Sequence, residues 1–381
     1  MSLPKPHITP DSFFHKTSPP ACLAPSPSSC PTTIYFISGN PGLISYYHPF
    51  LSLLSKNLTS ASSPGQNSFH VFGHSLAGFE LEPAPSPKTN AGTEKVKTKQ
   101  PPGTSGDYYY NVEDQIRFVQ ARLEAHMAAL RTESASSSAS ASGTDAPSQR
   151  PRVILMGHSV GTYIAMEVLR RHRENQTTTT TAAAAAGDSG FDIVGSIMLF
   201  PTVMDIANSP AGRKLTYLLR FIPQLALVVS LFARLLTSIL PNSIIRAAVR
   251  SVMQSPPETA VDATTAFLKS KRGVRQALHM GADEMRTITT DKWSDDVWGV
   301  SKAKEGPQPQ QQLLTRLFFY FGRNDHWVAE QTREEIIAAR GAVQNGPKMI
   351  VCEESLPHAF CLRHNETMAN KVADMVQEIL E

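Results

Sequence analysis

Short apolar runs alternate with stretches of helical periodicity along most of this chain. Apolar, β-branched or aromatic runs that end in turn residues predict buried strands at 32–38, 68–73, 153–156, 193–200, 316–322 and 348–352. Apolar residues spaced three or four positions apart predict helices at 46–58, 111–130, 160–173, 330–340 and 365–380. Strands that are apolar throughout are buried on both faces, so their alternation with helices favours a mostly parallel central sheet with helices on both faces.

Residues 203–300 interrupt this alternation, because they contain several helical patterns and no convincing strand. They lie between two late strands of the predicted sheet. We therefore expect an inserted helical cap over the carboxyl ends of the strands, where open α/β sheets place their sites.

Proline-, serine- and alanine-rich composition marks the segments expected outside the packed core. Residues 1–31 predict a poorly ordered N-terminal segment, and they lack the apolar stretch of a signal peptide. The remaining 32–381 is expected to form one domain. Low-complexity inserts are expected within it at 82–106, 132–150, 175–190 and 301–312.

The strongest candidate for chemistry is Ser159, in the run Gly157-His158-Ser159-Val160-Gly161. A serine hydroxyl acts as a nucleophile only when it is exposed, has a base nearby and has donors for the developing oxyanion. The run lies between a predicted strand and a predicted helix, and such an elbow exposes the serine. Gly157 and Gly161 keep the turn free of Cβ clashes, and the backbone N–H of Val160 is a candidate oxyanion donor.

A second serine has a similar setting. Ser75 follows a predicted strand in Gly73-His74-Ser75-Leu76-Ala77-Gly78. Alanine stands where the elbow needs its second glycine, and no long helix follows, so Ser75 is the weaker alternative.

The general base is expected to be a late histidine that follows an acid in chain order. His358 lies just past the last strand and before the last helix, and His364 is the rival. The acid must hold the imidazole in one tautomer and stabilise its charged form. Asp325, just after strand 316–322, is the first candidate, and Asp205 is the alternative.

The second oxyanion donor is expected from the loop after the first core strand, Gly39-Asn40-Pro41-Gly42. Proline has no N–H, so the backbone of Asn40 is the better candidate. The Asn40 side-chain amide is a further candidate donor.

Composition narrows the possible partners. The net charge of +3 over 381 residues gives no case for nucleic-acid binding. The four cysteines, Cys22, Cys30, Cys352 and Cys361, have no metal-ligand spacing and are expected to be reduced thiols of a protein that faces the cytosol. No cluster of histidine, aspartate or cysteine suggests a metal site, and the predicted chemistry needs no cofactor.

The stretch 216–240 has a broader apolar arc than the surface helices of soluble proteins normally show. Its predicted apolar face consists of Leu225, Val228, Val229, Phe232, Leu236 and Ile239. Arg234 interrupts it, which argues against a spanning helix and favours one that lies in a lipid interface and lets the arginine reach water. The alternative is a cap helix packed on the domain. Arg246 and Arg250, four residues apart, could meet lipid phosphates or face solvent.

Several of these motifs resemble lipid droplet-associated hydrolases over roughly residues 32–381. The motifs that carry the resemblance are Gly39-Asn40-Pro41-Gly42, Tyr46-Tyr47, Phe50, Gly157-His158-Ser159-Val160-Gly161, Leu199-Phe200-Pro201-Thr202, Ser209-Pro210, Gly212, Asp325-His326-Trp327 and His358-Ala359-Phe360. The resemblance implies an α/β-hydrolase fold with Ser159, Asp325 and His358 as its triad. It also implies a place at the lipid droplet and the endoplasmic reticulum membrane, and a role in lipid storage.

The residues and the resemblance together predict a serine esterase or lipase that cleaves carboxylic esters of apolar lipids, such as sterol esters or acylglycerols. Two alternatives stay open. One is a protein that organises lipid droplets with little catalytic output, and the other is an acyltransferase that uses the same triad in a cap that excludes water.

Overall fold

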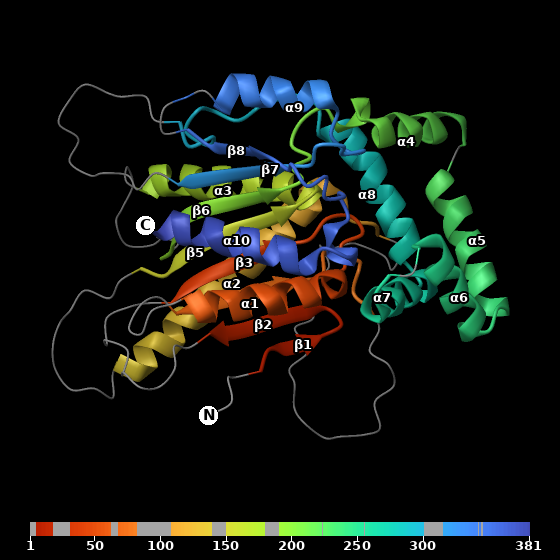
Figure 1. Ribbon diagram of the computed structural model, residues 1–381, viewed down its shortest axis with the longest axis horizontal. Coiled ribbons are helices and arrows are strands. Elements are labelled where there is room, and N and C mark those ends of the chain that lie inside the picture. Colours follow the sequence, from red (N-terminus) through yellow and green to blue (C-terminus); the bar gives the residue numbers. More distant parts are fainter. Residues whose placement is uncertain are drawn as a thin grey trace.

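The structure of this protein is a computed structural model, shown in Figure 1. It describes residues 5–17, 31–61, 68–81, 108–138, 150–179, 190–222, 224–254, 256–300, 315–341, 343 and 346–381.

One eight-stranded sheet forms the centre of the molecule. Its strands are β1 (His7–Thr9), β2 (Ser12–Thr17), β3 (Thr32–Ile37), β4 (Phe69–His74), β5 (Arg152–His158), β6 (Asp192–Leu199), β7 (Arg316–Phe321) and β8 (Lys348–Val351). The spatial order is β1-β2-β4-β3-β5-β6-β7-β8. Strands β3 to β8 pair in parallel, whereas β1 and β2 pair antiparallel at one edge. The predicted mostly parallel sheet is therefore confirmed.

The N-terminal hairpin was not predicted. Residues 7–17 form β1 and β2, and β2 pairs along its full length with β4. The expectation of a poorly ordered segment is wrong here, because Phe13 is fully buried and anchors the hairpin to the core. Residues 1–4 and 18–30 lie outside the described residues.

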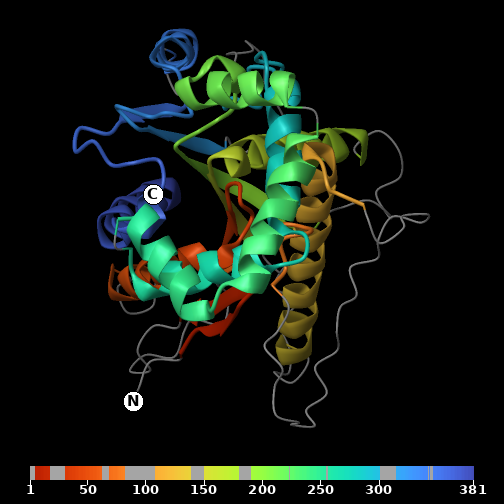
Figure 2. The same cartoon turned by 90° about the vertical axis from the view of Figure 1, so that its right-hand side faces the viewer.

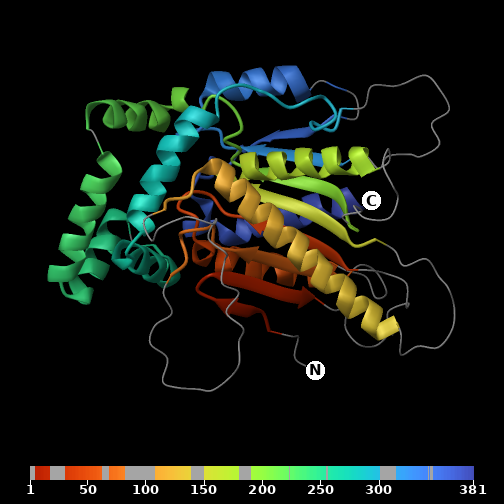
Figure 3. The ribbon, with the colours of Figure 1, turned by 180° about the vertical axis from the view of Figure 1, so that it is seen from behind.

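Helices cover both faces of the sheet. They are α1 (His48–Ala61), α2 (Val112–Ser138), α3 (Val160–Thr179), α4 (Pro210–Phe221), α5 (Leu225–Ile239), α6 (Asn242–Val252), α7 (Glu258–Lys269), α8 (Gly273–Thr287), α9 (Glu330–Ile336) and α10 (Asn365–Leu380), with short turns at Ile44–Tyr47, Ile206–Asn208, Ile337–Gly341 and Phe360–Leu362. Helices α1 and α10 lie on one face (Figure 1), and α2 and α3 lie on the other (Figure 3).

Alternate residues of β3 show why both faces are covered. Tyr35 and Ile37 belong to the core that includes α2 and α3, whereas Ile34 and Phe36 belong to the core that includes α1 and α10. Because successive side chains of a strand point to opposite faces, an apolar strand needs helices on both sides.

Two of the expected inserts begin later than predicted. Helix α2 continues to Ser138 and α3 to Thr179, so the first residues of the 132–150 and 175–190 inserts are helical. The rest of these two inserts, except for Arg150 and Gly190 at their ends, and the inserts at 82–106 and 301–312 lie outside the described residues.

Helices α4 to α8 form the predicted cap. They lie together at one end of the sheet, and Figure 2 views the molecule from that side. Helix α8 crosses the sheet end, and α4, α5 and α7 pack against it. In the part of the chain that the structure describes, no single helix is long and apolar enough to cross a membrane. The pair α4 and α5 meets that test together, with a bend of 94° between them.

Helix α5 is oriented with its small residues inward. Apart from Leu225 and Leu227 near its start, its more buried positions are Ala226, Ser230, Ala233 and Thr237, at i, i+4, i+7 and i+11, which places these four on one face. From Val228 onward, the large apolar residues point outward instead. This arrangement is the reverse of a soluble amphipathic helix, which buries its largest apolar side chains.

The predicted lipid-facing residues are mostly on that outer surface. Val228, Val229, Phe232 and Leu236 are exposed. Leu225 was predicted with them, but it is buried, because it lies in the first turn of α5, where the helix meets the rest of the cap. That prediction is wrong for Leu225.

Candidate active site

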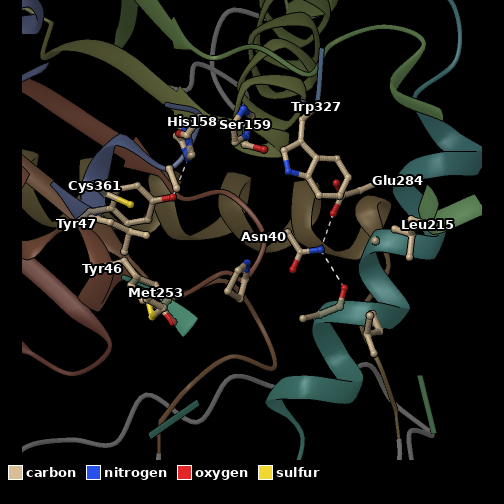
Figure 4. Close-up of a pocket in the computed structure, with 17 residues that line it drawn as sticks. Asn40, Tyr46, Tyr47, His158, Ser159, Leu215, Met253, Glu284, Trp327 and Cys361 are labelled. Atoms are coloured by element: carbon tan, nitrogen blue, oxygen red, sulfur yellow. Dashed lines mark hydrogen bonds between the residues drawn. The ribbon is translucent and has the colours of Figure 1, made fainter. Parts of the chain in front are cut away.

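Ser159 lies in a sharp turn between β5 and α3. Its backbone φ of 55° is in the left-handed region, a conformation that costs energy for a residue other than glycine and marks functional turns. A Cβ on Gly157 would lie 2.5 Å from the carbonyl oxygen of Gly161, and one on Gly161 would lie 2.3 Å from that of Ile37. Gly157 is therefore needed to close the turn itself, and Gly161 is needed for the turn to pack against the end of β3. The turn leaves Ser159 facing a cavity (Figure 4).

His358 and Asp325 are in contact. The Nδ1 of His358 donates to both carboxylate oxygens of Asp325, at 2.9 and 2.8 Å. The Asp325 side chain is almost fully buried, and its Oδ1 also accepts the backbone N–H of Trp327 at 2.8 Å. A buried carboxylate on Nδ1 fixes the imidazole orientation and leaves Nε2 as the nitrogen for proton transfer. His358 and Ser159 line the same cavity.

The alternatives for these roles lie elsewhere. Asp205 accepts a hydrogen bond from the Asn208 side chain, and His364 lies at the start of α10. Ser75 donates to Asp11 and accepts the N–H of Ile44, so it ties loops together. None of the three lines the cavity that contains Ser159.

The loop after β3 brings Asn40 next to the nucleophile. A Cβ on Gly39 would lie 2.9 Å from that of Ser159, so only glycine permits this approach. Within the described residues, the backbone N–H groups of Asn40 and Val160 have no hydrogen-bond acceptor. The Asn40 side chain is not a free donor, contrary to one expectation, because both its N–H groups are used by helix α8.

His158, the residue before the nucleophile, connects the loops around it. Its Nε2 donates to the backbone carbonyl of His358 at 2.9 Å, so its Nδ1 accepts from the Tyr47 hydroxyl at 2.8 Å. That hydroxyl in turn accepts the N–H of Gly39 at 3.3 Å. Burial, and then the nearby His358, hold the pKa of His158 well below its ordinary value. A neutral His158 therefore links the Asn40 loop to the His358 loop.

The cavity in front of Ser159 has a volume of about 450 Å³, within the range of small-molecule sites. The cap supplies much of its wall, through Leu215, Met253, Ala277, Leu278, Gly281 and Glu284. Cys361 also lines it, and burial raises the pKa of this thiol to about 12. Cys352 and Cys361 are free thiols, as expected, whereas Cys22 and Cys30 lie outside the described residues. No group of potential ligands that could hold a metal ion occurs among the described residues.

Glu284 and Tyr47 were not identified as site residues from the sequence. Glu284 is buried on the inner face of α8, in line with Gln276, Met280 and Ile288 at intervals of four residues. This spacing, readable from the sequence, places the glutamate on the buried face of the helix. A buried glutamate is rare, so the spacing could have identified Glu284 as a candidate. Tyr47 was noted only as part of a resemblance, and its hydrogen bonds join segments far apart in sequence.

Comparisons with known proteins agree on a family. The family model described as lipid-droplet associated hydrolase matches residues 30–361. The human lipid droplet-associated hydrolase is 24% identical over 350 residues, covering 91% of this chain and 85% of that protein. The rat protein of the same name is 25% identical over 352 residues, covering 91% and 85%. The one from Drosophila melanogaster is 25% identical over 347 residues, covering 90% and 88%.

Solved structures show the fold. A 2-hydroxy-6-oxo-6-phenylhexa-2,4-dienoate hydrolase from Rhodococcus superposes with a TM-score of 0.52 at 12% identity, covering 98% of this chain and all of that one. A haloalkane dehalogenase from Bradyrhizobium elkani superposes with a TM-score of 0.50 at 13% identity, covering 100% and 97%. Both are α/β-hydrolases, so the predicted fold class is confirmed.

Proposed function

Because this chain belongs to the lipid-droplet associated hydrolase family, we propose that it is a serine hydrolase that cleaves carboxylic esters of apolar lipids at the droplet surface. The family and the fold support hydrolase activity and a lipid-droplet association. The ester chemistry, the sterol ester or acylglycerol substrates, and a cytosol-facing place on droplets and the endoplasmic reticulum membrane are our proposal.

The observation that carries the chemistry is the His358–Asp325 pair beside the same cavity as Ser159. His358 takes the proton from the Ser159 hydroxyl as it attacks the ester carbonyl, and Asp325 stabilises the resulting imidazolium. The proton then goes to the leaving alcohol. Water, activated by His358 in the same way, releases the acid from Ser159.

The tetrahedral intermediate needs donors for its oxyanion. The two backbone N–H groups of Asn40 and Val160 flank Ser159 and have no acceptor among the described residues, so they suit this role. Val160 is the first residue of α3, and the positive end of the helix dipole adds to the stabilisation of negative charge.

The outer surface of the cap supports a lipid surface as the partner. Of the fifteen large hydrophobic side chains exposed in the described part of the chain, thirteen lie between Tyr217 and Val252, on or beside helices α4 to α6. Exposed large apolar side chains concentrated in one region of a protein mark interaction sites. Helix α4 contributes to both sides, since Leu215 lines the cavity while Tyr217, Leu218 and Phe221 are exposed. The exposed apolar surface that would contact lipid is therefore separated from the cavity by the single helix α4.

Basic residues complete this surface. Arg213, Lys214, Arg220 and Arg234 are exposed on α4 and α5, which contain no acidic residue, and none of the four forms an ion pair with a described residue. They are suited to anionic headgroups around the apolar face. Arg246 and Arg250 of α6 differ, because they pair with Glu258 and Asp262 of α7.

Labelling with a fluorophosphonate, followed by hydrolysis of triacylglycerol, sterol and short-chain esters, tests the proposal. The wild-type protein should be labelled and should cleave the lipid esters, and Ser159→Ala should do neither. Ser75→Ala is the matched control and should still be labelled. Equal labelling of wild type and Ser159→Ala would refute the assignment of the nucleophile.

The exposed cap also favours a second function, in which the protein organises droplets without much catalysis. Expression of Ser159→Ala and of a variant lacking 216–240 separates the two. A droplet size that changes with the deletion variant but not with Ser159→Ala would favour the organising role.

A further inference from the structure

Helix α8 of the cap holds the loop that follows β3. The side-chain amide of Asn40 donates one hydrogen bond to the carbonyl oxygen of Ala277 at 2.9 Å and another to Oε1 of Glu284 at 2.8 Å. Both acceptors belong to α8, and Glu284 also lines the cavity that contains Ser159 (Figure 4). Asn40 is therefore held by two bonds to an element more than 230 residues away in sequence.

This anchorage bears on the reaction because the backbone N–H of Asn40 is one of the two proposed oxyanion donors. Oxyanion stabilisation depends on donors lying at the right distance from the developing charge, and losing one donor typically costs 10²–10³ in rate. Whatever fixes the Asn40 side chain also fixes the direction of its backbone N–H.

Glu284 is an unusual residue for this position. It is only 4% exposed, and within the described residues no cation forms an ion pair with it. Burial, opposed by the Asn40 hydrogen bond and assisted by the charge of Asp283, raises the pKa of Glu284 to about 8. At neutral pH the side chain is therefore an uncharged acid, and above about pH 8 it becomes a carboxylate.

We propose that Glu284 is a positioning residue of the cap, which fixes the oxyanion loop through Asn40, and that its ionisation sets the upper pH limit of the reaction. This inference rests on the proposed serine hydrolase function. Ionisation of Glu284 places a negative charge in the cavity wall beside the loop that must stabilise another one. In a buried site such like charges repel strongly, so the transition state rises in energy.

Other charged groups around α8 do not remove this effect. Asp283 on the same helix disfavours the ionised form of Glu284. Across the cavity lie the side chains of Tyr46, Tyr47, His158, His358 and Cys361. The charged residues whose side chains are described on the elements packed against α8 are Glu113, Asp114, Arg117, Arg122, Glu124 and Arg131 on α2, Arg213, Lys214 and Arg220 on α4, Arg234 on α5, and Glu258, Asp262 and Lys269 on α7. Of all these groups, Asp283 is the charge that changes the pKa of Glu284.

The test is the pH dependence of kcat for a soluble short-chain ester, and of the rate of fluorophosphonate labelling, from about pH 6 to about pH 10. The wild type should lose activity with an apparent pKa near 8. Glu284→Gln should keep most of the activity at neutral pH, because glutamine still accepts from Asn40, and should lose the alkaline decline. Asp283→Asn, the matched control, should keep the decline and shift it to lower pH, since Asp283 raises the pKa.

Glu284→Ala should lower kcat by about tenfold to a hundredfold with little change in KM, because a displaced donor loop weakens the transition state and not substrate binding. If Glu284→Ala does not fold, Glu284→Gln alone decides. The inference is wrong if Glu284→Gln retains the wild-type decline, or if Glu284→Ala changes only KM. Failure of the wild type to label at Ser159 would instead refute the proposed function itself.

Discussion

Replacing three outward-facing residues of α5 should remove most of the affinity for a lipid surface. Phe232, Leu235 and Ile239 lie on one side of the helix at i, i+3 and i+7, and 60%, 55% and 68% of their surfaces are exposed. Fully burying an apolar side chain of this size stabilises by about 1.5–3 kcal/mol, so each gains about 1–2 kcal/mol on entering lipid. The three together contribute about 3–6 kcal/mol, which corresponds to a change in partitioning of about 10²- to 10⁴-fold.

The assay is flotation with artificial droplets that have a triolein core and a phospholipid monolayer. The triple variant Phe232→Ser, Leu235→Ser and Ile239→Ser is compared with wild type at several lipid concentrations. The matched control replaces Ile8 and Val343, the two large hydrophobic side chains exposed elsewhere in the described residues, with serine. Hydrolysis of a soluble ester and a thermal melt report whether each variant is folded.

The expected result is weaker flotation of the triple variant alone, with a melting temperature close to that of wild type. Partitioning of the triple variant within about threefold of wild type, a difference below about 1 kcal/mol, would refute the reasoning. Equal weakening by the control pair would also refute it, because the affinity would then not be located on α5.

Three further predictions follow from the geometry. Asp325→Asn should lower kcat by up to about 10⁴-fold, since an amide cannot hold His358 in the working tautomer, while Asp205→Asn should change it little; steady-state kinetics of both variants decides. Gly161→Ala should destabilise the fold by about 3 kcal/mol or more and abolish serine labelling, because the new Cβ would lie 2.3 Å from a β3 carbonyl; denaturant unfolding measures this. Arg234→Ala should weaken binding to anionic vesicles by about 1 kcal/mol and leave binding to neutral vesicles unchanged, as a co-sedimentation assay would show.

The fold was predictable where one short stretch of sequence determines the structure. The turn at Ser159 depends on a strand, two glycines and a helix within a few residues, and all of these can be recognised locally. Helix α2 is similar, because its apolar residues at regular spacing, Val112, Ile116, Val119 and Leu123, are all buried. Periodicity of this kind identifies the buried face of a helix when the protein core is the only apolar environment that the helix contacts.

Other features depend on contacts that local sequence does not encode. The hairpin at 7–17 is short and rich in polar residues, and it is held by its pairing with β4, more than 50 residues away. In α5 the periodicity identified the exposed apolar arc but not where the helix meets the rest of the cap, so Leu225 was wrongly included in it. The contact of Glu284 with Asn40 joins residues 244 positions apart.

The hairpin also affects how the sheet ends. A parallel sheet has two edge strands, and an unpaired edge can add strands from other molecules. Strand β2 covers β4 with a full ladder of six residue pairs, and the three-residue β1 is the edge that remains. At the other edge, β8 is only four residues long and begins with Lys348, which carries a charge. A chain starting at Pro31 would expose the whole of β4, and its apolar residues Phe69, Val71 and Phe72 would then be open to cross-chain pairing. We therefore expect the hairpin of β1 and β2 to limit cross-chain pairing at this edge of the sheet.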